Sequence, residues 1–191
     1  MTTRLVLMSF LTLDGVYQGP GSPDEDPSDG FERGGWLVPF VDAAFEARVT
    51  EWTATATAFL FSHHTYDAFA AAWPAVTDLT DRNAARLNAR PKFVAAMSPV
   101  EQAWTPVNVI DRNLEAQVSA LKRREEGELQ VHGSGKLGHT LLAAGLVDAL
   151  RRVIAPVLLG QGRRFSMQTT RSVSRGTYKQ GHVGCDSCVC S

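Results

Sequence analysis

The chain has 191 residues, 44% of them hydrophobic, a length and composition that suit one domain with a buried core. Its 19 lysine and arginine residues balance 20 aspartate and glutamate residues, for a formal net charge of -1, and no long basic run occurs. This charge pattern excludes nucleic acid as an expected partner, because phosphate backbones are bound by concentrated positive charge. No stretch reaches the roughly 20 apolar residues that cross a bilayer, and no signal-peptide cleavage site follows residues 4–13. We expect a cytoplasmic protein that binds no membrane.

The N-terminal third alternates between strand-like and helix-like stretches. Residues 4–13 are apolar apart from Ser9 and Thr12, which is typical of a strand buried on both faces of a largely parallel sheet. Residues 19–35 are rich in Gly, Pro and Asp and predict a long loop, a kind of segment that often covers a ligand. The next expected elements are a helix marked by Phe40, Ala44, Phe45 and Val49, a strand at 55–61, and a helix at 63–73 that Pro74 ends.

The remaining two thirds continue this alternation. The expected elements are a helix at 79–89, short strands at 92–97 and 106–110, a helix marked by Leu114, Val118 and Leu121, a strand at 128–132, a helix marked by Leu137, Leu141 and Leu142, and a long strand at 148–160. Gly145 is expected to cap the last of these helices. Strands that alternate with helices predict an α/β fold.

A glycine turn, Gly133-Ser134-Gly135, separates the strand at 128–132 from the helix that follows it. Glycines at such a junction let backbone N–H groups approach a phosphate, and the helix N-terminus favours negative charge. The spacing matches neither of the two common phosphate-binding glycine motifs. From spacing alone a structural corner is the simpler interpretation, and a phosphate cradle is the alternative.

Five stretches in sequence order carry a family resemblance: "SFLTLDG" (9–15), "TYDAFAAAWP" (65–74), "LNARPKFV" (87–94), "VHGSGKL" (131–137) and "PVLLGQG" (156–162). In this order they resemble the dihydrofolate reductase-like family. More narrowly, the chain is similar to stand-alone relatives of the reductase domain of the riboflavin-biosynthesis bifunctional deaminase-reductase. The resemblance covers about residues 4–165.

The resemblance implies a dihydrofolate reductase-like α/β fold, with a mixed, mostly parallel central sheet flanked by helices. It also implies a homodimer that binds NADPH and transfers hydride to a small heterocyclic substrate, as a 5-amino-6-(5-phosphoribosylamino)uracil reductase does. We therefore expect a reductase domain at residues 1–165 and an atypical tail at 166–191.

The same resemblance assigns the cofactor-binding residues. Gly133, Ser134, Gly135 and Lys136 would hold the phosphates, and Leu137 would pack behind the turn. Gly160 and Gly162 match a turn near the cofactor pocket, although bare glycines also suit the end of a strand.

Asp14 is the candidate catalytic residue, because the resemblance places residues 13–15 beside the nicotinamide and the substrate. Its carboxylate could orient or protonate a substrate, or it could serve only as a turn residue before Gly15. Trp36 and the loop around it could form a lid over the site or a solvated excursion.

One turn departs from the family pattern. Relatives carry Gly-Arg-x-Thr-Tyr after the second strand, with the arginine facing the 2′-phosphate, whereas this chain has Ser62-His63-His64-Thr65-Tyr66. His63 and Thr65 thus occupy cofactor-facing positions, but the permanent charge and fork of arginine are lost. A second phosphate-contacting position reads Ala95-Ala96-Met97.

Both changes predict weakened NADPH selectivity: use of NADH, another ligand, or no nicotinamide binding, as in a non-catalytic dimeric relative. His63 and His64 could also be surface residues at a helix start.

The three cysteines, Cys185, Cys188 and Cys190, lie in the last seven residues, with His182 nearby. This cluster lacks a second half, so we predict no metal site, and a metal- or redox-sensing tail is the weaker alternative. Residues 166–191 have few apolar side chains and no clear period. We expect a loosely ordered tail that supplies no buried strands.

Overall fold

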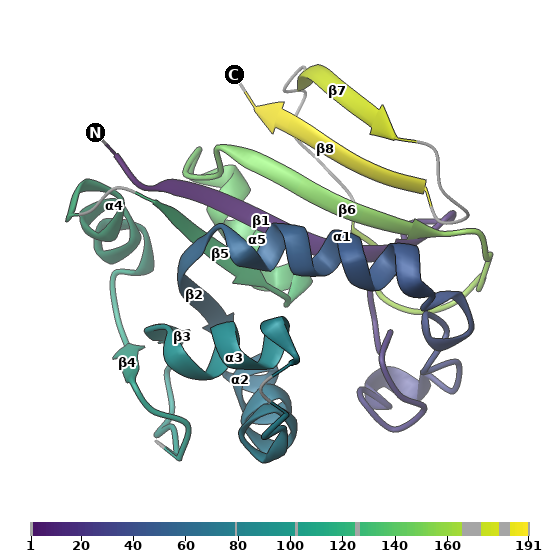
Figure 1. The fold of residues 1–191 in the computed structure, drawn as a ribbon, viewed down its shortest axis with the longest axis horizontal. Coiled ribbons are helices and arrows are strands. Elements are labelled where there is room, and N and C mark those ends of the chain that lie inside the picture. Colours follow the sequence, from purple (N-terminus) through teal and green to yellow (C-terminus); the bar gives the residue numbers. More distant parts are fainter. Residues whose placement is uncertain are drawn as a thin grey trace. The chain divides into compact units, whose positions relative to one another are not determined.

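The computed structural model describes residues 2–78, 80–101, 103–124 and 127–165 with their side chains, and the backbone of 173–179 and 184–190. The chain forms two compact units: Met1–Leu7 with Arg48–Asp148, and Met8–Ala47 with Ala149–Ser191. Strand β1 (Arg4–Thr12) begins in the first unit and ends in the second. The strands follow the order β4-β3-β2-β5-β1-β6-β8-β7 in one sheet (Figure 1).

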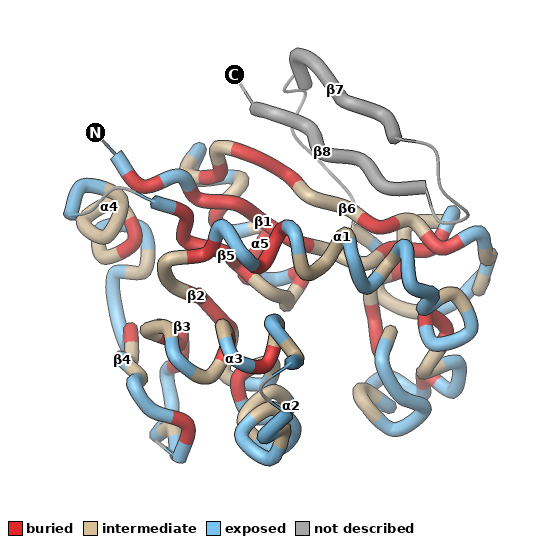
Figure 2. Tube along the Cα trace, viewed as in Figure 1, coloured by how far each residue is buried: buried red, intermediate tan, exposed pale blue. Residues whose placement is uncertain are grey.

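The first unit contains four parallel strands. They are β2 (Ala56–Ser62), β3 (Lys92–Ala95), β4 (Val107–Ile110) and β5 (Glu128–His132). Leu60 of β2 aligns with Phe93 on one side and Val131 on the other. Phe59, Leu60 and Phe61 are all fully buried, and part of β2 is coloured as buried in Figure 2. A strand covered on both faces needs such a continuous apolar run.

Helices connect β2 to β3 and β4 to β5, as is usual for parallel strands, whereas no helix is described between β3 and β4. The helices within this unit are α2 (His63–Ala72), α3 (Arg82–Ala89), α4 (Leu114–Arg124) and α5 (Gly135–Ala143), with a 3-10 turn η3 at Trp73–Ala75. Ser62 caps α2, and Asp81 caps α3 by accepting hydrogen bonds from two backbone N–H groups. A core cluster joins these elements: Ala56, Phe59, Phe61, Tyr66, Leu87, Val94, Ala96 and Trp104.

The second unit contains β6 (Ala149–Ala155) and two short 3-10 turns, η1 (Ser28–Gly30) and η2 (Val38–Phe40). Helix α1 (Ala43–Ala54) begins in this unit and ends in the first. The core cluster of the second unit consists of Val16, Phe31, Trp36, Leu37 and Ala155. Phe31, Trp36 and Leu37 thus anchor the 19–35 loop and the residues after it by apolar contacts.

The backbone also places two strands in the C-terminal tail. β7 (Val173–Lys179) pairs antiparallel with β8 (Gly184–Cys190), and β8 pairs antiparallel with β6. The tail thus contains two strands, which the sequence did not predict, whereas the expectation that it supplies no buried strands concerns side chains outside the described residues. Strand pairing uses backbone groups along the edge of β6, so it needs no apolar period in the added segment. A loosely ordered tail in solution stays a prediction.

Six neighbouring strands of the sheet are parallel, in the order β4, β3, β2, β5, β1 and β6. With the antiparallel β7 and β8 they make a mixed, mostly parallel sheet. This confirms the predicted fold class. The strand expected at 148–160 is shorter than predicted, because β6 ends at Ala155. Pro156 follows and has no N–H group to continue a ladder. None of the helices described in the structure is long and apolar enough to span a membrane.

Candidate functional site

The glycine turn lies between the end of β5 at His132 and the start of α5 at Gly135. Gly133 has a φ of 53°, a left-handed conformation that favours glycine, and the Gly133–Ser134 peptide bond is cis. Ser134 occupies the N-cap position of α5 with extended backbone angles, φ -82° and ψ 167°. The structure thus places the predicted turn at the carboxyl end of a parallel strand, where ligands bind in open α/β sheets.

The start of α5 differs from that of the neighbouring helices. Ser134 makes no side-chain capping hydrogen bond, whereas Ser62 and Asp81 cap α2 and α3. The first N–H groups of a helix have no intrahelical acceptor, and together they favour an anion. Lys136, exposed in the first turn of α5, adds a positive charge. This helix start therefore has donors for a phosphate group.

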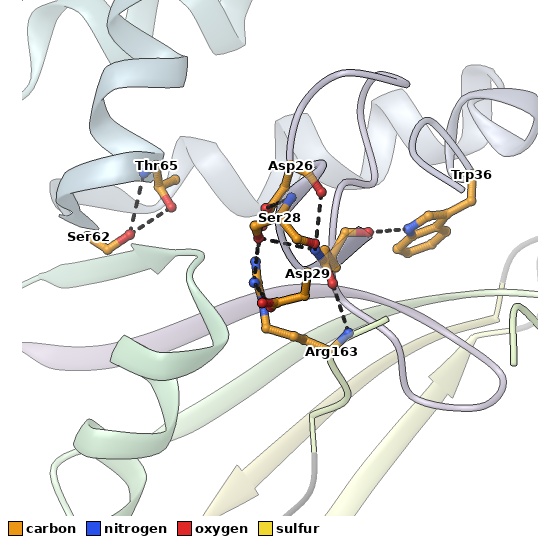
Figure 3. A network of polar contacts seen from close by, with 8 residues as sticks. Asp26, Ser28, Asp29, Trp36, Ser62, Thr65 and Arg163 are labelled. Atoms are coloured by element: carbon orange, nitrogen blue, oxygen red, sulfur yellow. Dashed lines mark hydrogen bonds and ion pairs between the residues drawn. The ribbon is translucent and has the colours of Figure 1, made fainter. Parts of the chain in front are cut away.

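Thr65 connects the turn to α2. Its hydroxyl lies 2.9 Å from the Ser62 hydroxyl, and its backbone N–H donates to the same oxygen at 3.4 Å (Figure 3). A Cβ atom at position 133 would lie 3.0 Å from the Thr65 Oγ1 atom. The first turn of α2 and the glycine turn after β5 are therefore packed together, and the predicted residues Thr65 and Gly133 meet in one place.

His63 begins α2 and is 30% exposed at its side chain. Its Nδ1 atom lies 3.0 Å from the Ser98 hydroxyl, and its Nε2 atom lies 3.6 Å from the Asp67 carboxylate. Ser98 follows β3 and was not among the sequence-predicted site residues. The Ser98 hydroxyl therefore lies one residue after Met97, which is 99% exposed.

Asp14 follows β1 in the second unit and accepts hydrogen bonds from four donors. Its carboxylate accepts from the Thr12 hydroxyl at 2.6 Å and from the Gly160 N–H at 2.9 Å. It also accepts from the Leu159 N–H at 3.2 Å and the Arg164 guanidinium at 3.1 Å. These hydrogen bonds, with Thr12 contributing most, hold the pKa of Asp14 well below its usual range. The carboxylate joins the residues after β1 to the residues after β6.

The two predicted glycines after β6 have different surroundings. Gly160 has a φ of 73°, and no atom lies within 4 Å of a Cβ built there. Gly162 has a φ of 101°, and a Cβ there would lie 2.7 Å from the Phe31 ring and 2.9 Å from Val16. Gly162 therefore has a packing reason to be glycine, whereas Gly160 has open space.

Arg163 connects the acidic loop, residues 19–35, to the segment after β6. Its guanidinium donates to Ser28 Oγ at 2.7 Å, to Asp29 at 3.0 Å, and to the Asp26 carboxylate (Figure 3). The buried Gln18 side chain accepts from the Arg163 N–H at 3.0 Å, and the Gln18 carbonyl accepts from the Trp36 indole at 2.7 Å. The loop is thus held by polar contacts as well as by its apolar anchors.

The structure therefore places the predicted site residues in two groups. His63, Thr65 and Gly133 to Leu137 lie in the first unit, and Asp14, Gly160 and Gly162 lie in the second. Sequence reasoning missed Ser98, Gln18, Arg163 and Arg164, since no local pattern marks them. It also missed a polar row on β5, for which the alternation of Glu128, Gln130 and His132 was a visible signal.

Among the described side chains, no group of three or more His, Cys, Asp or Glu residues could hold a metal ion. The side chains of the three cysteines and of His182 lie outside the described residues.

The sheet and its connections define an α/β protein with a dihydrofolate reductase-like fold. The chain belongs to the RibD C-terminal domain family, which matches residues 3–183. This confirms the resemblance found in the sequence. In a search of curated protein sequences, no protein matches this chain.

Solved structures show the same fold at low sequence identity. A Shewanella sp. PV-4 protein provisionally assigned to riboflavin biosynthesis aligns with a TM-score of 0.67 and 17% identity, over 99% of both chains. Dihydrofolate reductase from Enterococcus faecalis, complexed with NADP(H) and RAB-propyl, aligns with a TM-score of 0.62 and 12% identity, over 100% of this chain and 99% of that one. Acinetobacter baumannii RibD aligns with a TM-score of 0.61 and 14% identity, over 100% of this chain and 58% of that one.

Proposed function

We propose that this protein is an NAD(P)H-dependent reductase that transfers hydride to a small heterocyclic substrate. Membership of the RibD C-terminal domain family supports the reductase class. The observation that carries the cofactor assignment is the uncapped start of α5 behind the Gly133–Ser134 turn. A dinucleotide pyrophosphate is an anion of the kind that such a helix start accepts.

Four residues would hold the cofactor phosphates: Gly133, Ser134, Gly135 and Lys136. The turn fits this role, because any side chain at position 133 would be strained by the positive φ and crowded by Thr65. Leu137 is buried in the first turn of α5 and would support the turn from behind. When bound, the nicotinamide supplies the hydride, and the protein contributes binding, orientation and exclusion of water.

His63, Thr65 and the newly found Ser98 would face the adenosine end of the cofactor. Imidazole and hydroxyl groups replace the arginine that relatives carry there, so discrimination for the 2′-phosphate of NADPH should be weak. NADPH is the proposed cofactor, with NADH as a competing one.

In the second unit, Gly160 and Gly162 belong to the proposed cofactor pocket, and Asp14 belongs to the side proposed to face the nicotinamide and the substrate. With its pKa held low, the Asp14 carboxylate is ionised at neutral pH and has no proton to donate. We therefore assign Asp14 to orientation, through its hydrogen bonds to Leu159, Gly160 and Arg164, and not to protonation. We also propose that the protein acts as a homodimer in the cytoplasm.

A second candidate is a dimeric relative that has lost nicotinamide binding. The observation that favours it is the end of β3 and the residues directly after it, where Ala95, Ala96 and the exposed Met97 offer no polar side chain. The same experiment decides between the two candidates.

The test is a titration of the purified protein with NADPH and with NADH, followed by tryptophan fluorescence. We compare the wild type with Gly133→Ala and with the double variant Gly133→Asp, Gly135→Asp. Gly30→Ala is the matched control, because Gly30 also has a positive φ, 71°, but no atom lies within 4 Å of its Cβ position.

The proposed reductase function predicts saturable binding to the wild type. This binding should weaken about tenfold in Gly133→Ala, be lost in the double variant and be retained in Gly30→Ala. Each variant is first shown to be folded by circular dichroism. A folded wild type that binds neither nucleotide overturns the proposal in favour of the non-catalytic relative.

A further inference from the structure

A row of polar side chains runs along β5 toward the glycine turn. Glu128, Gln130 and His132 share one face of the strand, because successive side chains of a strand alternate. Glu128 is 5% exposed and Gln130 is fully buried. Buried polar groups are normally present because they are hydrogen-bonded, and this row meets that expectation.

The orientation of the Gln130 amide is fixed by its neighbours. Its Nε2 atom donates to the Trp52 backbone carbonyl at 2.6 Å and to Glu128 Oε1 at 2.5 Å. The Thr55 hydroxyl lies 3.3 Å from the same nitrogen and donates to Glu128 Oε1 at 2.6 Å. A backbone carbonyl can only accept, so the amide nitrogen must face Trp52 and the amide oxygen must face the other way.

This orientation determines a proton position on His132. The Nε2 atom of His132 lies 3.1 Å from Gln130 Oε1. An amide oxygen only accepts, so the histidine must donate, and its Nε2 atom must carry a hydrogen. The Trp52 carbonyl thus selects the histidine tautomer through Gln130.

The His132 ring is also held by aromatic side chains. Its centroid lies 5.4 Å from that of Phe59, 6.1 Å from that of Phe61 and 6.1 Å from that of Phe69. Phe59 and Phe69 meet the imidazole edge-on, at interplanar angles of 73° and 69°. The ring is therefore fixed by a hydrogen bond at one atom and by packing from β2 and α2.

We propose that His132, protonated at Nε2 and held by Gln130, is the positioning residue of the glycine turn. His132 is covalently joined to Gly133, so a fixed side chain at 132 fixes the direction in which the chain enters the turn. A pre-set turn binds a phosphate without first having to become ordered. This inference rests on the proposed function where it concerns the cofactor, whereas the tautomer and the turn conformation belong to the free protein.

Three substitutions at position 132 distinguish the effect of the hydrogen-bond donor from the effect of the packed ring. His132→Gln places an N–H donor where the imidazole Nε2 was, and His132→Asn places one at the position of Nδ1. His132→Phe keeps the aromatic packing and removes the donor. We expect His132→Phe and His132→Asn to weaken NADPH and NADH equally, about tenfold, because one hydrogen bond is lost. His132→Gln should recover most of the affinity.

Two NMR measurements on the free protein test the inference independently of cofactor binding. Long-range ¹H–¹⁵N correlations should show His132 with its proton on Nε2. The amide signals of Gly133 and Gly135 should shift in His132→Phe and return toward wild type in His132→Gln.

A His132 protonated only at Nδ1, or amide signals of the turn that are unchanged in His132→Phe, would overturn the inference. So would cofactor affinities that are equal in His132→Phe and His132→Gln. If the wild type binds neither nucleotide, the proposed function fails, and the NMR results still decide the role of His132.

Discussion

The ammonium group of Lys92 lies 4.5 Å from the centre of the Trp104 ring, and both side chains are buried. The Lys92 Nζ atom donates to the backbone carbonyls of Asn88 and Arg90, each at 2.9 Å. The Trp104 indole donates to the Asn88 side chain at 2.7 Å. Lys92 therefore satisfies carbonyl groups at the end of α3 from within the core of the first unit.

Stability should rise with pH in the alkaline range because of Lys92. Burial lowers the pKa of Lys92 from 10.5 to about 8. Between these values the unfolded chain binds more protons than the folded one, so raising the pH favours folding. Below pH 8 both states carry the proton and the cost of burying the charge is constant. The pKa difference corresponds to about 3 kcal/mol.

Urea denaturation at pH 7.5, 9 and 10.5 checks this for the wild type and for Lys92→Met. The free energy of unfolding of the wild type should rise relative to that of Lys92→Met by up to about 3 kcal/mol across this range. Lys136→Met, which removes an exposed lysine, serves as the control. A constant difference between wild type and Lys92→Met would show that the buried amine does not titrate there.

Asp14→Asn should destabilise the protein most at neutral pH and progressively less as the pH falls below 4. The folded-state pKa of Asp14 lies below its unfolded value of 3.8, so the ionised carboxylate stabilises the fold above pH 4, and this contribution is lost as the pH falls toward the folded-state pKa. Thermal unfolding at pH 7 and pH 2 measures it. An equal loss in melting temperature at both pH values would contradict an ionised role for Asp14.

Arg163→Met should release the acidic loop locally without unfolding the protein. The guanidinium contacts Asp26, Ser28 and Asp29, whereas Trp36 stays bonded to the Gln18 carbonyl. Loss of about 1–2 kcal/mol of local stability raises the open population roughly 5- to 30-fold. Limited proteolysis should therefore cut within residues 19–35 faster by such a factor. Arg164→Met, which loses the Asp14 contact instead, is the control and should leave this loop protected.

Local sequence patterns predicted the interior of the fold well. The strands predicted at 4–13 and 55–61 correspond to β1 and β2, since a strand buried on both faces needs a largely apolar run. The helices predicted at 63–73 and 79–89 correspond to α2 and α3, and α3 begins later than predicted because Asp81 caps it. The glycine turn was predicted from its two glycines, and Gly133 has the positive φ that favours glycine.

What the sequence did not reveal depends on partners far along the chain. Arg163 and Asp26 are 137 residues apart, and His63 and Ser98 are 35 apart. No periodicity encodes such pairs, because they form only after the strands have assembled. β7 and β8 were missed for a related reason, since their pairing depends on the available edge of β6.

His63→Arg should increase the preference for NADPH over NADH. His63 begins α2 beside Ser98, at the position where the family resemblance leads us to expect an arginine. An arginine would offer the 2′-phosphate charge-assisted hydrogen bonds, each worth about 1.5–3 kcal/mol. The dissociation constant for NADH divided by that for NADPH should therefore rise tenfold or more. Each factor of ten corresponds to about 1.4 kcal/mol of binding free energy. His64→Arg adds the same charge at the neighbouring exposed position, where no phosphate contact is expected, and should change the ratio little. Equal gains for both nucleotides in His63→Arg would mean that the added charge attracts the pyrophosphate in general and that position 63 does not face the 2′-phosphate.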